Sequence, residues 1–331
     1  MRNSKITGVG HFVPERIVTN HDLEKLMDTT DEWIVERTGI HERRFFNPEK
    51  DTNANMSARA AHLALDRAGI PVKDIQLIVY ATITPDYMFP GSGVLMQREL
   101  GIEGIPAIDI RNACSGFIYA LSIADQYIKT GMYDNALVVG AEIQSSGLDL
   151  TTRGRAVSVI FGDGAGAVVL QPTDKQNQGI LSTHLHADGN FAEELYVKDP
   201  GSSRKVRMSK EMLEGETIYG YMNGNLVFKH AIVRFIEVIQ ESLTHNSCKK
   251  EDIDLLIPHQ ANLRISTYVE EKLGLKGRVY HNITRYGNTT GASIPIALSE
   301  AWEEGRISDG KLVCLAAFGS GFTWASALIR W

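Results

Sequence analysis

Cysteine is scarce in this chain, and its few cysteines lie far apart. Cys114, Cys248 and Cys314 show no short pair spacing among the 331 residues, which argues against zinc sites and a disulfide framework. No stretch approaches the roughly 18–20 apolar residues of a membrane-spanning helix. The first ten residues lack the apolar core of a signal peptide. We therefore expect a cytoplasmic protein without metal or disulfides.

Basic residues are also not in excess: the chain has 34 Lys and Arg residues against 40 Asp and Glu residues. The net charge of −6 argues against a dedicated nucleic-acid binder. With 43% apolar and 22% charged residues, the composition is typical of a soluble globular protein with a full-sized core. The length fits one large domain or two of ordinary size.

An internal repeat organises the sequence. Segments of the first half recur in the second half in the same order and at a nearly constant offset. The matched pairs are 74–81 with 252–259, 98–102 with 271–275, Cys114 with Asn288, and 136–142 with 312–318. Short β-branched runs alternate with helical stretches, which predicts mostly parallel sheets covered by helices. We predict two α/β halves, 1–173 and 174–331, whose equivalent strand ends meet at one site.

A long segment at 188–220 interrupts the second half. It mixes charge, glycine and proline, and we interpret it as an excursion from the fold. Excursions of this length in a compact fold often form binding loops or lids.

Cys114 lies between an apolar run and an apolar helical stretch at 115–129. This order predicts a sulfur on the first turn of a buried helix, where unpaired N–H groups and the helix dipole favour a thiolate. Acyl transfer by a thiolate needs a nitrogen partner and an oxyanion stabiliser, which His259 and Asn288 could supply. Taken singly, these residues could be a buried small side chain, a structural histidine and a turn asparagine. Together they predict acyl chemistry through a cysteine.

Six ordered motifs resemble those of the beta-ketoacyl-acyl-carrier-protein synthase III family of the thiolase superfamily. They lie at 30–40 (TDEWIVERTGI), 113–117 (ACSGF), 161–167 (FGDGAGA), 259–262 (HQAN), 287–290 (GNTT) and 318–324 (FGSGFTW). The resemblance covers nearly the whole chain and implies a five-layered α-β-α-β-α thiolase-like fold of class α/β. It also implies a homodimeric acyltransferase with a Cys114-His259-Asn288 site and no metal or redox cofactor.

The resemblance assigns further residues to the site. Backbone N–H groups of Cys114 and Ser320 would form an oxyanion hole. The expected substrate contacts are Trp33, Arg37, Arg155, Gly224 and Asn262 for coenzyme A and its pantetheine, Phe89 for the acyl pocket of the partner, and Lys229 and Arg264 for docking of acyl carrier protein. Arg153 is an alternative to Arg155. The chain departs from the family at Ser320, often a glycine, and at Glu271, where paired lysines are common.

The predicted reaction is a decarboxylative Claisen condensation of an acyl-CoA primer with malonyl-acyl carrier protein, which initiates fatty acid biosynthesis. One alternative is a specialised relative that joins longer or 3-oxo acyl chains in secondary metabolism. Others are a non-condensing acyltransferase and a non-catalytic acyl-binding subunit. Asn288 disfavours the non-condensing transferase, because transfer alone needs no decarboxylation site. A reversible thiolase is disfavoured because Cys314 lies outside the Gly319–Gly321 loop.

Overall fold

Two sheets with the same strand order form the frame of the molecule. The computed structural model describes residues 2–331. The first sheet has the order β1 (Asn3–Phe12), β7 (Gly164–Thr173), β6 (Ala136–Glu142), β4 (Leu77–Ala81) and β5 (Ala107–Ile110). The second has the order β8 (Gly179–Ala187), β13 (Thr323–Arg330), β12 (Leu312–Gly319) and β11 (Leu255–Pro258).

Strand direction repeats between the sheets as well. In each sheet the first three strands pair antiparallel, and the remaining strands pair parallel. A parallel bridge from Leu256 to Val279 takes the place that β5 holds in the first sheet. Only β7 and β13 run against the other strands of their sheets, so the prediction of mostly parallel sheets holds for strand direction except at these two strands. The link from β6 to β7 holds only short helical turns such as α6 (Arg155–Ser158), so this connection reverses the chain without the longer helical crossover of parallel strands.

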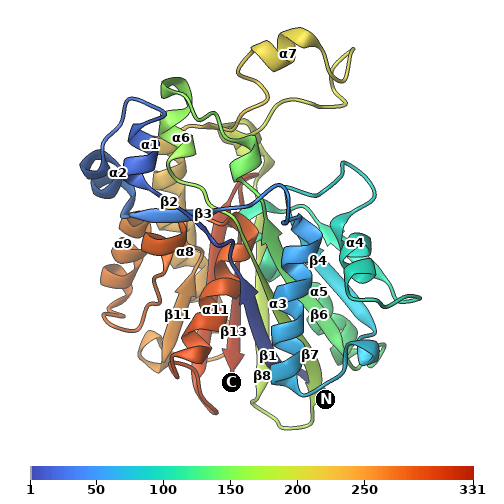
Figure 1. Cartoon of the computed structure of the whole chain (residues 1–331). Coiled ribbons are helices and arrows are strands. Elements are labelled where there is room, and N and C mark those ends of the chain that lie inside the picture. The colour runs from blue at the N-terminus through green and yellow to red at the C-terminus, as the bar shows by residue number, and fades with distance from the viewer. Residues whose placement is uncertain (1) are drawn as a thin grey trace.

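Helices complete a stack of five layers, as Figure 1 shows. Between the sheets lie α5 (Gly116–Lys129) and α11 (Ser293–Glu303). The outer face of the first sheet is covered by α3 (Asn53–Ala68) and α4 (Ser92–Glu99), and that of the second by α8 (Gly224–His245) and α9 (Leu263–Leu273). The predicted five-layered thiolase-like arrangement is confirmed.

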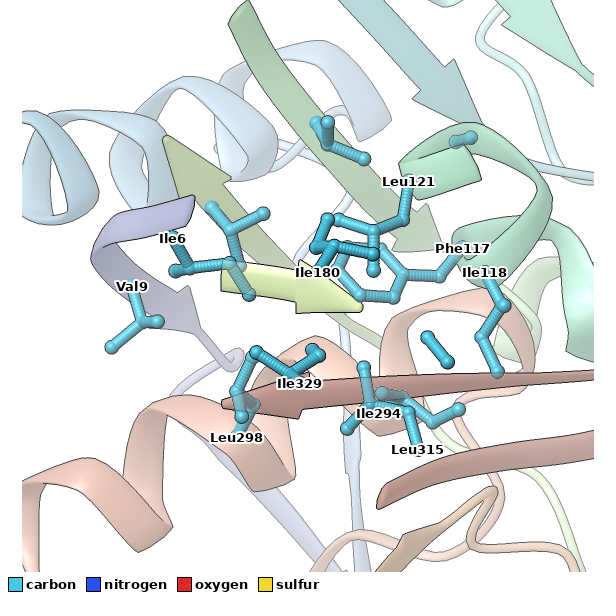
Figure 2. Packing of buried hydrophobic residues seen from close by; sticks show 14 of the residues in the cluster. Ile6, Val9, Phe117, Ile118, Leu121, Ile180, Ile294, Leu298, Leu315 and Ile329 are labelled. Carbon is cyan, nitrogen blue, oxygen red and sulfur yellow. The ribbon is translucent and has the colours of Figure 1, made fainter. Parts of the chain in front are cut away.

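The main core lies between the two sheets. In Figure 2, Phe117 and Leu121 from α5 and Ile294 and Leu298 from α11 lie among buried strand residues such as Ile180. Burying one such side chain stabilises the fold by about 1.5–3 kcal/mol. The predicted buried helix at 115–129 is confirmed, with its α-helical part beginning at Gly116.

Shorter elements sit over one end of the sheets (Figure 1). They are β2 (Arg16–Thr19), α1 (Asn20–Glu24), α2 (Asp31–Thr38), β3 (Glu42–Phe45) and α10 (Ile283–Tyr286). Polar side chains start the helices that flank the cavity: Thr30 caps α2, Asn223 caps α8, and Asn262 caps α9. Each accepts a hydrogen bond from a free N–H group of the first turn.

The excursion at 188–220 begins after β8 and returns before α8. Its base is a two-stranded ribbon of β9 (Leu195–Tyr196) and β10 (Tyr221–Met222). Beyond the ribbon, an arm that carries α7 (Lys210–Glu214) projects from the body (Figure 1). Within residues 2–331, no helix combines the length and the apolar character needed to cross a membrane.

Candidate active site

Cys114, His259 and Asn288 line one cavity of about 620 Å³. Each lies at the end of a different segment: Cys114 before α5, His259 after β11, and Asn288 after α10. The structure thus brings together the three residues that the sequence singled out, although Cys114 and Asn288 are 174 positions apart in the chain. All three are buried, with exposed fractions of 7%, 2% and 6%.

Cys114 occupies a 3-10 turn, Ala113–Ser115, that leads directly into α5. The end of β12 passes so close to this turn that a Cβ at Gly319 would lie 2.6 Å from the Cβ of Cys114 and 2.9 Å from its Sγ. Only glycine fits at that position. The close approach places the backbone that follows, at Ser320, beside the sulfur.

The sulfur is a thiol in the free chain. Burial raises the pKa of Cys114 to about 12, and the negative charge of Glu142 raises it further, while the backbone N–H groups of Cys114 and Ser320 lower it. The expectation that the helix start favours a thiolate was therefore wrong, because desolvation outweighs those N–H groups. The N–H groups of Cys114 and Ser320 thus both lie next to the sulfur.

His259 is a neutral imidazole with one nitrogen free. Burial lowers its pKa to about 3. Its Nδ1 lies 2.6 Å from the hydroxyl oxygen of Ser293, which also accepts a hydrogen bond of 3.4 Å from the backbone N–H of Gln260. In the tautomer in which the Ser293 hydroxyl donates to Nδ1, Nε2 carries the imidazole hydrogen. Nε2 itself has no partner among residues 2–331, which leaves an N–H donor available in a buried site.

Asn288 is oriented by its own turn. Its Oδ1 accepts a hydrogen bond of 2.8 Å from the backbone N–H of Thr290. Its backbone is fixed from both sides by hydrogen bonds with Ile160 (2.8 Å) and Gly162 (3.1 Å). Because the oxygen is held by the turn, the side-chain NH2 is left to donate to a ligand in the cavity.

The structural counterpart of Cys114 is Gly291. The 3-10 turn Thr290–Ala292 leads into α11 as the turn Ala113–Ser115 leads into α5. The first residues of the two turns, Ala113 and Thr290, share an unusual positive φ of 46° and 49°. The predicted pairing of Cys114 with Asn288 was therefore wrong by three residues, because Asn288 lies before this turn, where it bridges Phe161.

Two arginines flank Trp33. The guanidinium carbons of Arg37 and Arg155 lie 4.4 Å and 5.2 Å from the centre of its ring. Arg153 instead pairs with Asp149 at 2.6 Å. The structure thus places Arg155, not Arg153, beside Trp33.

The other predicted contact residues divide into two groups. Those that line the cavity with Cys114 are Arg37, Gly224, Lys229, Asn262 and Arg264. Asn262 also donates to the backbone oxygen of Arg37 at 2.9 Å, which joins α9 to α2. Phe89 does not line this cavity and lies 79% exposed in the loop before α4.

Sequence reasoning missed several residues near the reacting groups. Glu142, at the end of β6, is buried, and burial raises its pKa to about 7. Its carboxylate accepts hydrogen bonds from the Thr84 hydroxyl (2.5 Å) and the Ile83 N–H. The signal for it was a glutamate closing an otherwise apolar strand. Leu195 and Met222, from the ribbon of the excursion, also line the cavity.

A metal in the cavity would need several side chains that could bind it. Residues 2–331 contain no group of three or more His, Cys, Asp or Glu side chains arranged to bind one. The polar residues that line the cavity include the hydrogen-bond donors just described, Asn225, and the cationic Arg37, Lys229 and Arg264. This arrangement suits a ligand with a carbonyl at its buried end and negative charge at its outer end.

Comparisons with known proteins agree with this geometry. Residues 108–189 match the profile of 3-oxoacyl-[acyl-carrier-protein] synthase III, and residues 243–331 match its C-terminal profile. Beta-ketoacyl-[acyl-carrier-protein] synthase III of Thioalkalivibrio sulfidiphilus is 48% identical over 331 residues, covering 100% of each chain. The protein of the same name from Aliivibrio fischeri is 47% identical over 328 residues, covering 99% of each.

Solved structures show the same relationship. The 3-oxoacyl-[acyl-carrier-protein] synthase III of Aquifex aeolicus matches with a TM-score of 0.90 at 42% identity, covering 99% of this chain and 100% of that one. The synthase III of Thermus thermophilus matches with a TM-score of 0.90 at 40% identity, covering 99% of each. The predicted family, fold and enzyme class, an acyltransferase, are confirmed. This chain belongs to the beta-ketoacyl-[acyl-carrier-protein] synthase III family.

Proposed function

We propose that this enzyme condenses an acyl-CoA primer with malonyl-acyl carrier protein and so starts fatty acid chains. The observation that carries the proposal is the meeting of three groups in one cavity: the Cys114 thiol, the unpartnered Nε2 of His259 and the NH2 of Asn288. One group can form a covalent thioester, and two can donate hydrogen bonds to a carbonyl oxygen. The names of the relatives support the same reaction.

In the first half-reaction, the Cys114 sulfur attacks the thioester carbon of acyl-CoA. The backbone N–H groups of Cys114 and Ser320 stabilise the negative oxygen of the tetrahedral intermediate. The carbon–sulfur bond to coenzyme A then breaks, and the proton lost by Cys114 ends on the departing coenzyme A sulfur. The products are acyl-Cys114 and free coenzyme A.

In the second half-reaction, the thioester carbonyl of malonyl-acyl carrier protein accepts hydrogen bonds from Nε2 of His259 and Nδ2 of Asn288. Loss of CO2 leaves an enolate, and its carbon attacks the carbonyl of acyl-Cys114. The Cys114 thiolate leaves and takes up a proton from solvent. Each of the two donors contributes about 3–4 kcal/mol to stabilising the enolate-like transition state, in line with donors of other oxyanion sites.

The outer residues fit the substrates by shape and charge. Trp33 with Arg37 and Arg155 offers an aromatic face and two cations to the adenine and phosphates of coenzyme A. Gly224 and Asn262 border the passage that pantetheine would follow. The basic Lys229 and Arg264 line the same cavity and would attract the acidic carrier protein.

Three further assignments belong to the same proposal. The enzyme works as a homodimer in which the exposed Phe89 closes the acyl pocket of the partner subunit. The reaction needs no metal or redox cofactor, because the thioesters supply the leaving groups and decarboxylation drives carbon–carbon bond formation. The cytoplasm, where thiols such as Cys114 stay reduced, is the proposed compartment.

Intact-mass spectrometry with a series of acyl-CoAs, from acetyl to dodecanoyl, tests the proposal. We expect a short-acyl adduct on Cys114 that malonyl-acyl carrier protein discharges with release of CO2. Adducts from long or 3-oxo chains alone would assign the enzyme to secondary metabolism instead. The absence of any adduct would refute the cysteine chemistry.

A further inference from the structure

Two buried polar side chains that touch no substrate hold the segment that ends in Asn288. Gln260 follows His259 directly and is 2% exposed, and Glu300 lies on α11 and is 6% exposed. The segment between them, 280–288, carries Asn288 at its end. Neither Gln260 nor Glu300 is used by the reaction as described above.

Gln260 joins the strand end that carries His259 to the start of this segment. Its Nε2 donates to the backbone oxygens of Pro258 (2.7 Å) and Tyr280 (3.1 Å). Its Oε1 accepts from the backbone N–H groups of Asn282 (3.0 Å) and Ile283 (3.3 Å). All four bonds run to backbone groups, so the side chain fixes how far the segment lies from β11.

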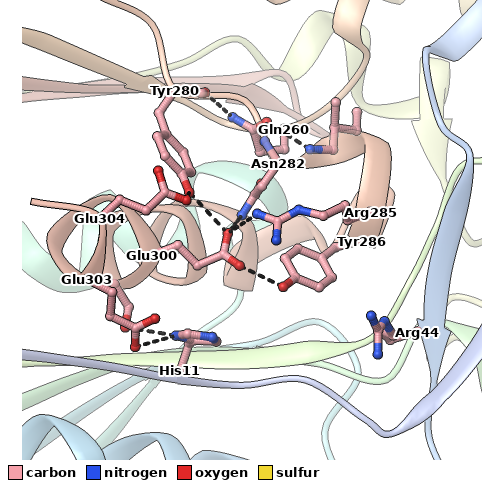
Figure 3. Close-up of polar contacts among 12 residues, drawn as sticks. His11, Arg44, Gln260, Tyr280, Asn282, Arg285, Tyr286, Glu300, Glu303 and Glu304 are labelled. Atoms are coloured by element: carbon pink, nitrogen blue, oxygen red, sulfur yellow. Dashed lines mark hydrogen bonds and ion pairs between the residues drawn. The ribbon is translucent and has the colours of Figure 1, made fainter. Parts of the chain in front are cut away.

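Glu300 holds the middle of the segment. Its carboxylate accepts hydrogen bonds from the Tyr286 hydroxyl (2.6 Å), the Asn282 side-chain NH2 (2.8 Å) and the Arg285 guanidinium (3.1 Å). Figure 3 shows these three side chains converging on the one carboxylate. Tyr286 is two residues from Asn288, so the position of Asn288 depends on this anchor.

Helix α11 links both donors of the site. Its first residue, Ser293, contacts Nδ1 of His259, and Glu300 lies two turns further along the same helix. A displacement of the segment relative to α11 would therefore change the separation of Asn288 from His259. The Cys114 turn precedes α5 and shares none of these hydrogen bonds.

We propose that Gln260 and Glu300 are positioning residues for the decarboxylation half-reaction, which set the two donors of His259 and Asn288 at the spacing that one carbonyl oxygen requires. The inference rests on the proposed function, since it presumes that these donors act on the malonyl thioester. It assigns to the two residues an effect on decarboxylation and none on the acylation of Cys114.

The experiment compares both half-reactions in matched variants. Glu300→Gln keeps the side-chain length but turns an NH2 group toward the donors, and Gln260→Glu turns an oxygen toward the carbonyls of Pro258 and Tyr280. Asp66→Asn, a change of the same kind at an exposed carboxylate on α3, away from the 280–288 segment, is the control. CO2 release from malonyl-acyl carrier protein and Cys114 acylation by acetyl-CoA are measured separately, with the melting temperature of each variant.

We expect CO2 release to fall about 100-fold in both test variants, as misplacement by an ångström or so can cause. Acylation should stay within about twofold of the unaltered enzyme, and Asp66→Asn should change neither rate. Undiminished CO2 release, or an equal loss in both half-reactions, would overturn the proposal. If the two variants do not fold, Tyr286→Phe, which removes one hydrogen bond to Glu300, is tested instead. The loss of CO2 release is again compared with the loss of Cys114 acylation.

The failure of the proposed function itself has a different signature. His259→Ala and Asn288→Ala variants that release CO2 at the full rate would show that these donors do not act on malonyl. In that case the half-reactions are wrongly assigned, whatever Gln260 and Glu300 do.

Discussion

The hydroxyl of Ser320 donates a hydrogen bond to the backbone oxygen of Leu195. This contact joins the loop after β12, which carries a proposed oxyanion donor, to the ribbon of the 188–220 excursion, which lines the cavity. Next to it, Asp188 and Phe322 exchange two backbone hydrogen bonds of 2.8 Å each. Ser320 is not among the residues with positive φ, so a side chain at this position causes no backbone strain. The Ser320 hydroxyl instead adds one hydrogen bond between the two segments.

Ser320→Gly should therefore loosen the cavity wall without removing the oxyanion N–H. We expect a several-fold higher KM for acyl-CoA with kcat changed less than about threefold, because one hydrogen bond contributes about 1 kcal/mol. Steady-state kinetics and hydrogen exchange of residues 188–222 measure the two effects. A large fall in kcat with unchanged exchange would show that the hydroxyl acts on the oxyanion hole instead.

Cys114→Ser and Asn288→Ala should separate the two half-reactions. The serine variant should form no acyl-enzyme, because an unactivated hydroxyl is a poor nucleophile. The alanine variant should acylate normally but release CO2 about 100–1000-fold more slowly, the usual effect of losing one oxyanion donor. Mass spectrometry and CO2 assays give the readouts. Covalent labelling of Cys114→Ser by acyl-CoA would contradict the nucleophile assignment.

His259 should make the protein less stable in acid. Burial holds its folded pKa at about 3, below the ordinary value of 6.5, so in this interval the unfolded chain binds a proton that the folded chain does not. The free energy of unfolding should accordingly fall as pH drops from about 6.5 toward 3. Chemical denaturation across this range should show a shallower fall in His259→Asn, which has no titrating ring. If the free energy of unfolding fell equally steeply with pH in both proteins, the His259 ring would have the same pKa in the folded and unfolded chains.

Glu142 should make the protein less stable as pH rises, and its charge should also affect the pKa of Cys114. Its folded pKa of about 7 lies above the ordinary 4.5, so its contribution to stability is lost as pH rises between these values. Glu142→Gln should remove that loss. It should also lower the pKa of Cys114, because a negative charge beside the thiol disappears. Alkylation of Cys114 by iodoacetamide at pH 9 should be faster in the variant, and an unchanged rate would contradict the coupling.

Carrier docking should respond to Glu271. This exposed residue lies on α9 two turns beyond Arg264, and both line a groove that shares Arg264 with the active-site cavity. Glu271→Lys should lower the KM for malonyl-acyl carrier protein by roughly two- to fivefold at low salt, with less effect at high salt. The KM for acyl-CoA in the first half-reaction serves as the control. A salt-independent change would argue against electrostatic docking.

Motifs along the chain were enough to predict the thiolase-like fold and the three residues that meet in the cavity. They did so because their order and spacing resemble those of one family, whereas the local pattern alone placed only Cys114 and His259, each after an apolar strand. The ionisation of Cys114 was not predictable, since burial by distant segments decides it. The ties between Ser320 and Leu195 and between Gln260 and the 280–283 backbone were also hidden. They depend on contacts between segments far apart in sequence.

The turns before α5 and α11 are equivalent in backbone conformation but differ in the side chain that they carry. At the position of Cys114 in the first half, the second half has Gly291, where a Cβ would lie 3.2 Å from the Glu142 carboxylate and 3.3 Å from the Ala113 oxygen. A second sulfur there would crowd the turn that presents the first. Of the two equivalent turns, only the one in the first half therefore carries a nucleophile, and the repeated scaffold holds a single covalent site.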